Sequence, residues 1–340
     1  MNEENKICKL CIMPEHLPEI YLNNEGICNL CVAHETAKKF DIQKPLESDL
    51  IKILNKYKGK QKYDCMVMCS GGKDSTSSLY YMKKRYGLNV LAFTFDHGFE
   101  TDEALENIKN AVEILKVDFM LFSSSFMQDM FAKIVSTNSK AVICHPCSIW
   151  YMDLAFDVAA RYEIPIIVAG WTKGQSTRQE VMSKCGCNVH AAEFKQMADN
   201  TKFFLENELK DMPQYKNFPR TMEEVLARSK KRFKSIVISP HWFLPYSTEE
   251  YVKVIKDELK WKAPVFSYPA GSTNCSLNFM SVYYSMKHYG YTHYHVEASK
   301  MIREGLLLRE EALKQLELNF DEKTLKMIAG KLGVNNFETI

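Results

Sequence analysis

The chain has 340 residues, of which 46 % are hydrophobic and 25 % charged, and its net charge at pH 7 is +2. This composition is that of ordinary globular proteins and excludes the fibrous and intrinsically disordered classes. Proteins that wrap nucleic acid usually carry a clearly basic face, so the near balance of charges does not favour a large polyanionic partner.

The sequence predicts no membrane association. No apolar stretch approaches the roughly 18 residues of a membrane-spanning helix, and the N-terminus lacks the basic-then-apolar order of a signal peptide. We therefore expect a cytoplasmic protein. Its eleven cysteines, several of them in close pairs, are then more suited to metal binding or catalysis than to disulfides.

Three regions differ in composition. Residues 1–40 are turn-rich and carry paired cysteines, residues 60–245 alternate apolar runs with helical patterns, and residues 246–340 are mostly helical. We predict an N-terminal zinc-ribbon-like segment, a central nucleotide-binding domain and a C-terminal helical region. The last region would serve as a substrate lid or an oligomer contact.

Short apolar runs in the central region predict strands at Cys65–Cys69, Val90–Phe95, Phe119–Ser123, Ile164–Ala169 and Ser235–Ser239. Helical patterns between them cover Ser75–Tyr86, Thr101–Leu115 and Ser148–Tyr162. Wholly apolar strands that alternate with helices indicate an α/β fold, a doubly wound parallel sheet covered on both faces. Ligands of such sheets bind at the carboxyl ends of the strands.

The segment Ser70-Gly71-Gly72-Lys73-Asp74-Ser75 follows the first predicted strand and opens a helix. Its glycines let backbone N–H groups approach an anion, and the helix N-terminus adds a partial positive charge. Lys73 supplies a point charge, while the hydroxyls of Ser70 and Ser75 suit phosphate oxygens. Asp74 would repel a bare phosphate, so we expect it to cap the helix or to hold magnesium.

This hexapeptide resembles the PP-loop of the enzymes that split ATP into AMP and pyrophosphate, whose fold is HUP-like. The group includes argininosuccinate and asparagine synthetases, tRNA thiolases and N-acetyl-sugar amidotransferases. The resemblance implies ATP and Mg²⁺ as cofactors. It also implies nucleotide contacts at Asp96 and His97 after the second strand and at Gly170 and Trp171 after the fourth. Trp171 and Lys173 replace the histidine and acidic residues that are commoner in relatives.

Two cysteine pairs, Cys8-x-x-Cys11 and Cys28-x-x-Cys31, are separated by a spacing typical of a four-cysteine zinc site. A segment with almost no core of its own needs a metal to fold. We therefore predict a structural Zn²⁺ here, with a redox pair as the alternative.

A third pair, Cys144-His145-Pro146-Cys147, lies just before the predicted helix Ser148–Tyr162. A thiolate near a helix N-terminus is expected to have a lowered pKa. Such a pair with one distant cysteine, for which Cys275 is preferred over Cys185 and Cys187, could hold a [4Fe–4S] cluster with one open iron. The alternative is a second zinc site built from Cys144, Cys147, Cys185 and Cys187.

The position of this third pair resembles that in PP-loop enzymes that insert sulfur into tRNA or nucleobases. The resemblance implies adenylylation of a carbonyl or amide oxygen, followed by sulfur insertion from Cys144 and Cys147 or from the cluster. Lys73 and Asp74 would act at the phosphates. The implied partners are a small-molecule or nucleobase substrate and a sulfur donor such as a cysteine desulfurase. A tRNA substrate is not favoured on charge grounds, and a homodimer is expected from related enzymes.

Two alternatives stay open at this point. The N-terminal pairs and the tail Glu304–Ala312 resemble N-acetyl-sugar amidotransferases, which need a partner that supplies ammonia. Many of those carry Val where this chain has Lys73, and we expect no pair like Cys144 and Cys147 in them. The other alternative is a zinc-ribbon module that binds nucleic acid, against which the charge balance argues.

Overall fold

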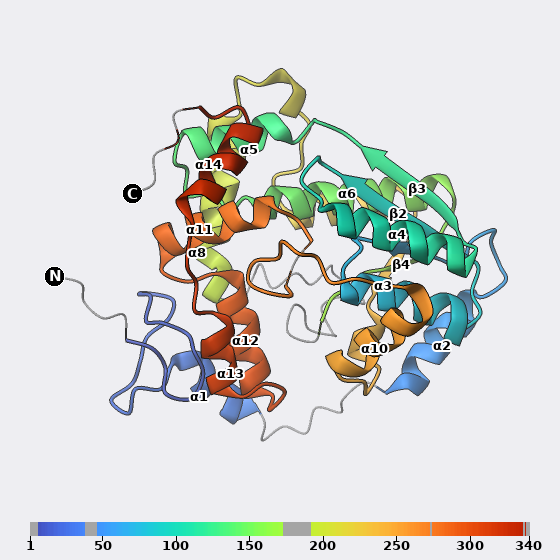
Figure 1. Ribbon diagram of the computed structural model, residues 1–340, viewed down its shortest axis with the longest axis horizontal. Helices are drawn as coiled ribbons and strands as arrows, with labels where there is room; N and C mark the ends of the chain where they lie inside the picture. The colour runs from blue at the N-terminus through green and yellow to red at the C-terminus, as the bar shows by residue number, and fades with distance from the viewer. Residues whose placement is uncertain (1–5, 38–45, 173–191, 273, 336, 338–340) are drawn as a thin grey trace.

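The computed structural model describes residues 6–37, 46–172, 192–272, 274–335 and 337 (Figure 1). Its strands are β1 Cys65–Met68, β2 Val90–Asp96, β3 Asp118–Ser123, β4 Ile166–Val168 and β5 Ile236–Ile238. Its α-helices are α1 Asn29–Ala37, α2 Glu47–Tyr57, α3 Lys73–Tyr80, α4 Asp102–Leu115, α5 Gln128–Ser136, α6 Cys144–Arg161, α8 Ala192–Phe203, α9 Met222–Arg232, α10 Thr248–Leu259, α11 Leu277–Tyr289, α12 His293–Arg303, α13 Arg309–Gln315 and α14 Glu322–Lys331. Within the described ranges, no helix is both long and apolar enough to cross a membrane.

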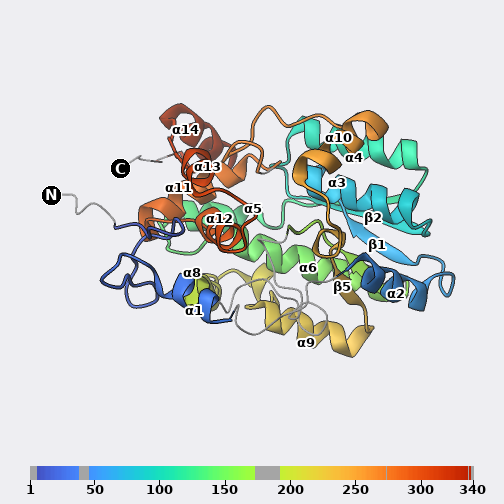
Figure 2. The ribbon, with the colours of Figure 1, turned by 90° about the horizontal axis from the view of Figure 1, so that it is seen from below.

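The named strands form one parallel sheet in the order β3-β2-β1-β4-β5. At its centre Val67 of β1 pairs with Ala92 of β2 on one side and with Val168 of β4 on the other. The central strands β1 and β4 are wholly apolar and buried because helices cover both faces of the sheet there, whereas the edge strand β3 is mostly exposed. Figure 2 shows α3, α4 and α10 on one face and α6 and α9 on the other. The predicted fold class is confirmed.

The strand order indicates where a ligand of this sheet would bind. From β1 the chain crosses to β2 on one side, and β4 later returns to the other side of β1. In parallel sheets a crevice opens at such a switch point, outside the carboxyl ends of the two strands. The residues that follow these ends are Ser70 after β1 and Gly170 after β4.

One helix boundary differs from the sequence prediction in a way that matters for function. We expected Cys144 and Cys147 to precede their helix, but α6 begins at Cys144, so both thiols lie in its first turn. Pro146 is compatible with this position because N–H groups in a first helical turn have no partner within the helix.

The N-terminal segment packs against the C-terminal region. Its four paired cysteines share an apolar cluster with Tyr289, Tyr291 and Val296. The guanidinium group of Arg309 donates hydrogen bonds to the carbonyl oxygens of Cys8 and Cys11, at 3.1 and 2.8 Å. Figure 1 shows this segment, in blue, beside α12 and α13. The C-terminal region therefore supplies the apolar core that the N-terminal segment lacks by itself.

Candidate active site

The phosphate loop Ser70–Ser75 is tightly built. Gly71 has φ +74°, and a Cβ atom there would lie 2.1 Å from the carbonyl oxygen of Ala104. Gly72 is the N-cap of α3 in an extended conformation, so the first N–H groups of the helix follow it directly. The hydroxyl oxygens of Ser70 and Ser75 lie 3.1 Å apart. Hydroxyls and a helix N-terminus gathered in this way suit the phosphates of a nucleotide.

The loop after β4 presses against this phosphate loop. A Cβ atom at Gly170 would lie 2.6 Å from the backbone nitrogen and Cα of Ser75. No side chain fits at that distance without moving the start of α3. Gly170 therefore fixes the spacing between the two loops of the switch point.

A cavity of about 370 Å³ opens beside the phosphate loop. Its lining includes most of the nucleotide contacts predicted from sequence: Ser70, Gly72, Lys73, Asp74, Ser75 and Gly170. The other predicted contacts, Gly71, Asp96, His97 and Trp171, are not among the lining residues. The carboxylate of Asp96 accepts a hydrogen bond from the backbone of Gly98, and the Trp171 ring stacks on Trp242.

A segment in which only Cys275 was predicted from sequence to be functional lines this cavity. We call residues 261–272 and 274–276 the strap. The Trp261 indole donates a hydrogen bond to the carbonyl oxygen of Gly71 at 2.9 Å, and the Lys73 ammonium donates one to that of Gly271 at 3.1 Å. The strap therefore holds the phosphate loop from outside the central domain.

The charges at the cavity are mixed. The Lys73 ammonium lies 3.2 Å from a carboxylate oxygen of Asp74, which also accepts a hydrogen bond from the Tyr251 hydroxyl. Asp74 does not cap α3 as expected, because the helix begins one residue earlier, at Lys73, with Gly72 as its cap. Its carboxylate lines the cavity and is of the type that binds magnesium beside phosphates. Lys256, missed by sequence reasoning, adds a second cation.

Cys275 joins the cavity to the third cysteine pair. Its thiol lines the cavity, and the neighbouring groups Glu100, Cys144 and Cys147 raise its pKa further after burial. The three sulfur-bearing side chains Cys144, Cys147 and Cys275 therefore lie in one electrostatic neighbourhood, which we call the three-cysteine group. Cys185 and Cys187, the alternatives considered from sequence, lie outside the described residues.

The thiols of this group are not activated by the helix terminus. Burial raises the pKa of the Cys144 thiol, although a hydrogen bond to the Ser281 hydroxyl at 3.2 Å acts in the opposite direction. Burial and the adjacent Cys144 also raise the pKa of Cys147. The lowered pKa expected from sequence is wrong, because the desolvation cost exceeds the favourable effect of the α6 N-terminus.

The distances among the three sulfur atoms restrict the kind of metal centre that they could bind. Around one zinc ion, sulfur atoms at about 2.3 Å from the metal lie about 3.8 Å from each other. In the described part of the chain, two sets of potential ligand atoms lie within 4.8 Å of one another. One is the N-terminal quartet, and the other consists of His97, Glu100 and Cys275. The three-cysteine group is wider than the shell of one zinc ion. Three thiolates are the donor type that larger centres such as iron–sulfur clusters use.

Glu100, also missed by sequence reasoning, lines the same cavity. Burial raises the pKa of its carboxyl group to about 8, with a further contribution from Asp96. The nearby His97 ring has its pKa lowered to about 4 by burial. Burial therefore favours the uncharged form of both groups.

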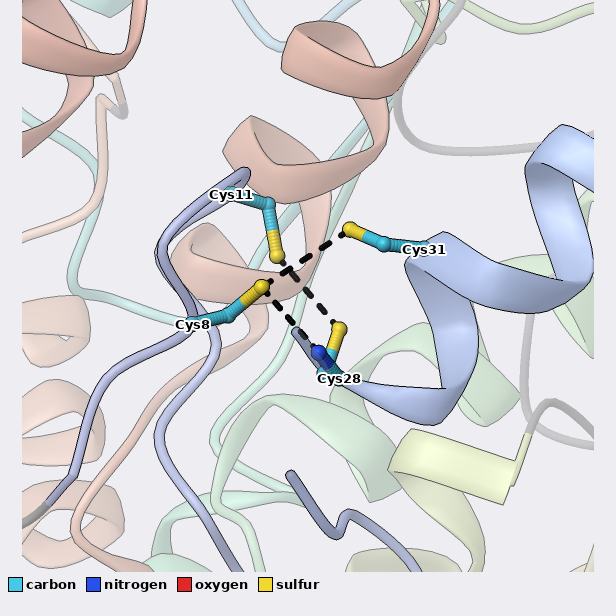
Figure 3. A group of neighbouring side chains, drawn as sticks. All are labelled: Cys8, Cys11, Cys28 and Cys31. Atoms are coloured by element: carbon cyan, nitrogen blue, oxygen red, sulfur yellow. Dashed lines mark hydrogen bonds between the residues drawn. The ribbon is translucent and has the colours of Figure 1, made fainter. Parts of the chain in front are cut away.

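The N-terminal quartet has the geometry of a closed metal site. Figure 3 shows the four thiols pointing toward one another, with Cys31 carried by α1. The sulfur atoms of Cys8 and Cys31 lie 3.9 Å apart, and those of Cys11 and Cys28 lie 3.7 Å apart. Both distances match the edge of a zinc–sulfur tetrahedron. All four side chains are buried, which leaves no position for a substrate.

Comparisons with known proteins give a family match in the central part of the chain. Residues 64–212 match the family model of the queuosine biosynthesis protein QueC. The chain is 24 % identical over 314 residues to an uncharacterised protein of Methanocaldococcus jannaschii, covering 91 % of this chain and 92 % of that protein.

Remote structural likenesses exist as well. The U34-tRNA thiolase NcsA of Methanococcus maripaludis, solved with its [4Fe–4S] cluster, aligns with a TM-score of 0.38 and 16 % identity, covering 92 % of this chain and 90 % of that one. The NMN synthetase of Francisella tularensis aligns with a TM-score of 0.40 and 14 % identity, covering 86 % and 95 %. The NH₃-dependent NAD synthetase of Campylobacter jejuni aligns with a TM-score of 0.32 and 15 % identity, covering 55 % and 90 %.

The segment matched by QueC contains the phosphate loop, the parallel strands β1 to β4 and the loop at Gly170 that closes on Ser75. Sequence motif, topology and family model agree. Residues 64–212 are thus similar to QueC, a PP-loop ATP pyrophosphatase.

Proposed function

We propose that this enzyme uses ATP to adenylylate a carbonyl or amide oxygen of its substrate and then replaces that oxygen by sulfur. One observation carries the proposal: the Cys275 thiol lines the phosphate cavity and is close enough to Cys144 and Cys147 for their charges to raise its pKa. A site that activates an oxygen and a site that carries sulfur would therefore share one cavity.

The first step uses the phosphate loop. The β- and γ-phosphates of ATP lie against the N-terminus of α3, where Lys73 and Lys256 offset their charge and Asp74 holds the accompanying Mg²⁺. The substrate oxygen attacks the α-phosphorus, a bond to that oxygen forms and pyrophosphate leaves. Catalysis at this step is positioning and charge stabilisation. Lys73 must first exchange the carbonyl oxygen of Gly271 for a phosphate oxygen.

The second step uses the three-cysteine group. A sulfur nucleophile at the oxidation level of sulfide attacks the activated carbon, and the former carbonyl oxygen leaves with AMP. The thiocarbonyl product forms without net oxidation or reduction. Cys144, Cys147 and Cys275 fit a [4Fe–4S] cluster as three ligands, and such a cluster would supply an iron position that binds sulfide. In the version without a metal, the outer sulfur of a persulfide on Cys144 or Cys147 attacks the carbon, and the other thiol of the pair then breaks the sulfur–sulfur bond. This leaves a Cys144–Cys147 disulfide, which a thiol reductant must reduce before the next turnover.

The substrate and donor follow from charge and chemistry. With a net charge of +2 on 340 residues, we favour a small molecule or a free nucleobase over tRNA. Sulfide in the cell comes from cysteine, so a desulfurase is the donor partner of this scheme.

An oxygen-18 experiment tests the proposal. Carbonyl-labelled nucleobases and total tRNA are incubated anaerobically with the enzyme, ATP and sulfide, and AMP is analysed by mass spectrometry. We expect ¹⁸O in AMP and sulfur in the substrate, both abolished in Cys144→Ser. Cys65→Ala is the matched control, because Cys65 is buried in β1, away from the cavity lining.

Other outcomes have defined meanings. Labelled AMP with ammonia but not with sulfide, unaffected by Cys144→Ser, would replace the proposal by an amidotransferase. Hydrolysis of ATP to ADP, with no AMP, would contradict the adenylylation step itself.

A further inference from the structure

Glu100 and Cys275 are fixed side by side by the backbone. Glu100 lies in the loop between β2 and α4, and it forms an isolated antiparallel bridge with Cys275 of the strap. Beside this bridge, the Thr101 N–H donates a hydrogen bond of 2.9 Å to the carbonyl oxygen of Asn274. The relative position of the two residues is therefore set by main-chain contacts.

The imidazole of His97 approaches the same pair from the end of β2. Only 4 % of the side chain is exposed, because the rings of Phe95, Phe99 and Phe131 surround it with centroids 5.5, 5.8 and 5.6 Å away. Rings packed in this way leave the imidazole little freedom to turn. The direction in which its nitrogen atoms point is thus fixed by the core of the domain.

The three side chains have the spacing of ligands around a single ion. The Nε2 atom of His97 lies 3.8 Å from a carboxyl oxygen of Glu100 and 3.8 Å from the sulfur of Cys275, and all three donor atoms lie within 4.8 Å of one another. A nitrogen–oxygen separation of 3.8 Å is too long for a hydrogen bond. Around a tetrahedral zinc ion with bonds of about 2.0–2.3 Å, neighbouring ligand atoms lie about 3.3–3.8 Å apart. A small inward movement of the side chains would complete such a shell.

One side of this donor set is open. Glu100 and Cys275 line the phosphate cavity, whereas the buried His97 is not among the lining residues. An ion held by the three would thus keep its fourth position toward the cavity, as in zinc sites with three protein ligands and a water molecule. The cavity also gives the ion a way in. Imidazole, thiolate and carboxylate are all common zinc ligands.

We propose that His97, Glu100 and Cys275 form a mononuclear Zn²⁺ site, separate from the N-terminal quartet. When the ion binds, the Cys275 thiol releases its proton to solvent and a metal–sulfur bond forms, with no change of oxidation state. The quartet supplies four buried thiols, whereas this site has three ligands and an open position. Its ion should therefore exchange with a chelator under conditions in which the quartet retains its own.

Occupation of this site by zinc excludes the cluster. This step rests on the proposed function in its cluster version, in which Cys275 is the third cluster ligand. Its thiolate completes one centre or the other: the zinc ion with His97 and Glu100, or the cluster with Cys144 and Cys147. Zinc would therefore block cluster assembly, and sulfur insertion with it.

Cobalt titration tests the site, because tetrahedral Co²⁺ bound to a thiolate absorbs visible light and Zn²⁺ does not. Full-length protein purified without a cluster is treated with a chelator until about one zinc per chain remains, and is then titrated anaerobically with cobalt chloride. We expect one Co²⁺ per chain in wild type and in Glu113→Gln, a control at an exposed position of α4. In Glu100→Gln the Kd should rise at least tenfold. An equal Kd in the three proteins would overturn the proposal.

A measurement on the unmutated chain does not depend on how the variants fold. X-ray absorption at the cobalt edge identifies the ligand atoms of the added ion in wild type. We expect one sulfur and one imidazole, with oxygen as the other ligands. Two or more sulfur ligands would place the ion on Cys144 and Cys147 or in the quartet and would overturn the proposal, as would the absence of bound cobalt.

Competition with the cluster is measured separately. Wild type and Glu100→Gln, each with and without one added equivalent of zinc, are reconstituted anaerobically with iron and sulfide. We expect zinc to reduce iron uptake at least fivefold in wild type and to have little effect in Glu100→Gln. Equal uptake with and without zinc in wild type would overturn the exclusion. Wild type that takes up no iron even without zinc would contradict the cluster version of the proposed function, while the cobalt data would still decide on the zinc site.

Discussion

The side-chain amide of Asn274 donates a hydrogen bond to the carbonyl oxygen of Ser70 at 3.1 Å, and the next residue in the chain is Cys275. The amide also lies 3.3 Å from the Ser70 hydroxyl oxygen. The strap therefore ties the phosphate loop directly to a member of the three-cysteine group. Of the contacts between the strap and the phosphate loop, the one from Asn274 lies nearest in sequence to Cys275, so we expect it to couple occupancy of the loop by ATP to the position of the Cys275 sulfur.

Asn274→Ala is expected to break this link. The loss of one hydrogen bond, worth about 1 kcal/mol, should raise the Kd for ATP about fivefold. In wild type depleted of metal, saturating ATP should change the alkylation rate of Cys275 by iodoacetamide, read by peptide mass spectrometry. In the variant that ATP dependence should disappear. Retention of the full ATP effect would show that the two sites are not joined through Asn274.

Gly170→Ala is expected to damage nucleotide binding without unfolding the chain. The added methyl group would overlap the backbone of Ser75 and displace the start of α3. We expect at least a tenfold loss of ATP affinity by calorimetry, about 1.4 kcal/mol. Gly330→Ala in α14 is the matched control, because a Cβ atom there meets nothing within 4 Å and helix propensity favours alanine. Equal ATP affinity in both variants would disprove the close approach at Gly170.

The N-terminal quartet is expected to bind about one zinc ion per chain. Cys28→Ser should abolish that zinc, while Cys65→Ala should retain it. Because Arg309 binds the carbonyl oxygens of Cys8 and Cys11, zinc loss should also increase hydrogen exchange in α13, at the opposite end of the sequence. Exchange confined to residues 6–37 would show that the two ends of the chain are not stabilised together.

His293 provides a prediction for acid stability. Burial, with smaller effects from His145 and His295, lowers the pKa of its imidazole to about 3. As pH falls from 6.5, the unfolded chain takes up a proton that the folded chain does not, so stability should fall through the window from pH 6.5 to about 3. In His293→Gln the slope of unfolding free energy against pH should be shallower by up to one proton, about 1.4 kcal/mol per pH unit. Urea unfolding at matched metal content measures both slopes, and identical slopes would mean that His293 titrates normally.

The fold and the phosphate loop could be predicted because they depend on local patterns. Apolar runs ending in glycine located β1 and the loop at Ser70–Ser75, and alternation with helices gave the parallel sheet. The N-terminal quartet was equally readable, since its spacing alone restricts the geometry of four thiolates.

The rest of the site depends on contacts between distant segments. Glu100 meets Cys275 through a backbone bridge between a loop and the strap, neither of which has a periodic pattern. From sequence, Cys275 could be preferred as a third ligand, but its position beside the phosphate cavity could not be predicted. Asn274, Trp261 and Lys256 belong to no motif that would have predicted a role for them. The expected activation of Cys144 failed because the burial of a side chain is set by the whole fold and not by its helix position.

The most direct test of sulfur chemistry at the three-cysteine group is metal and sulfide analysis of anaerobically purified wild type and Cys144→Ala. We expect about one zinc with roughly four iron and four acid-labile sulfide per chain, with the iron and sulfide lost in the variant and the zinc retained. One zinc with no iron in wild type would contradict the cluster-dependent scheme. Sulfur insertion would then have to proceed through a persulfide on Cys144 or Cys147, and ammonia transfer would gain equal standing.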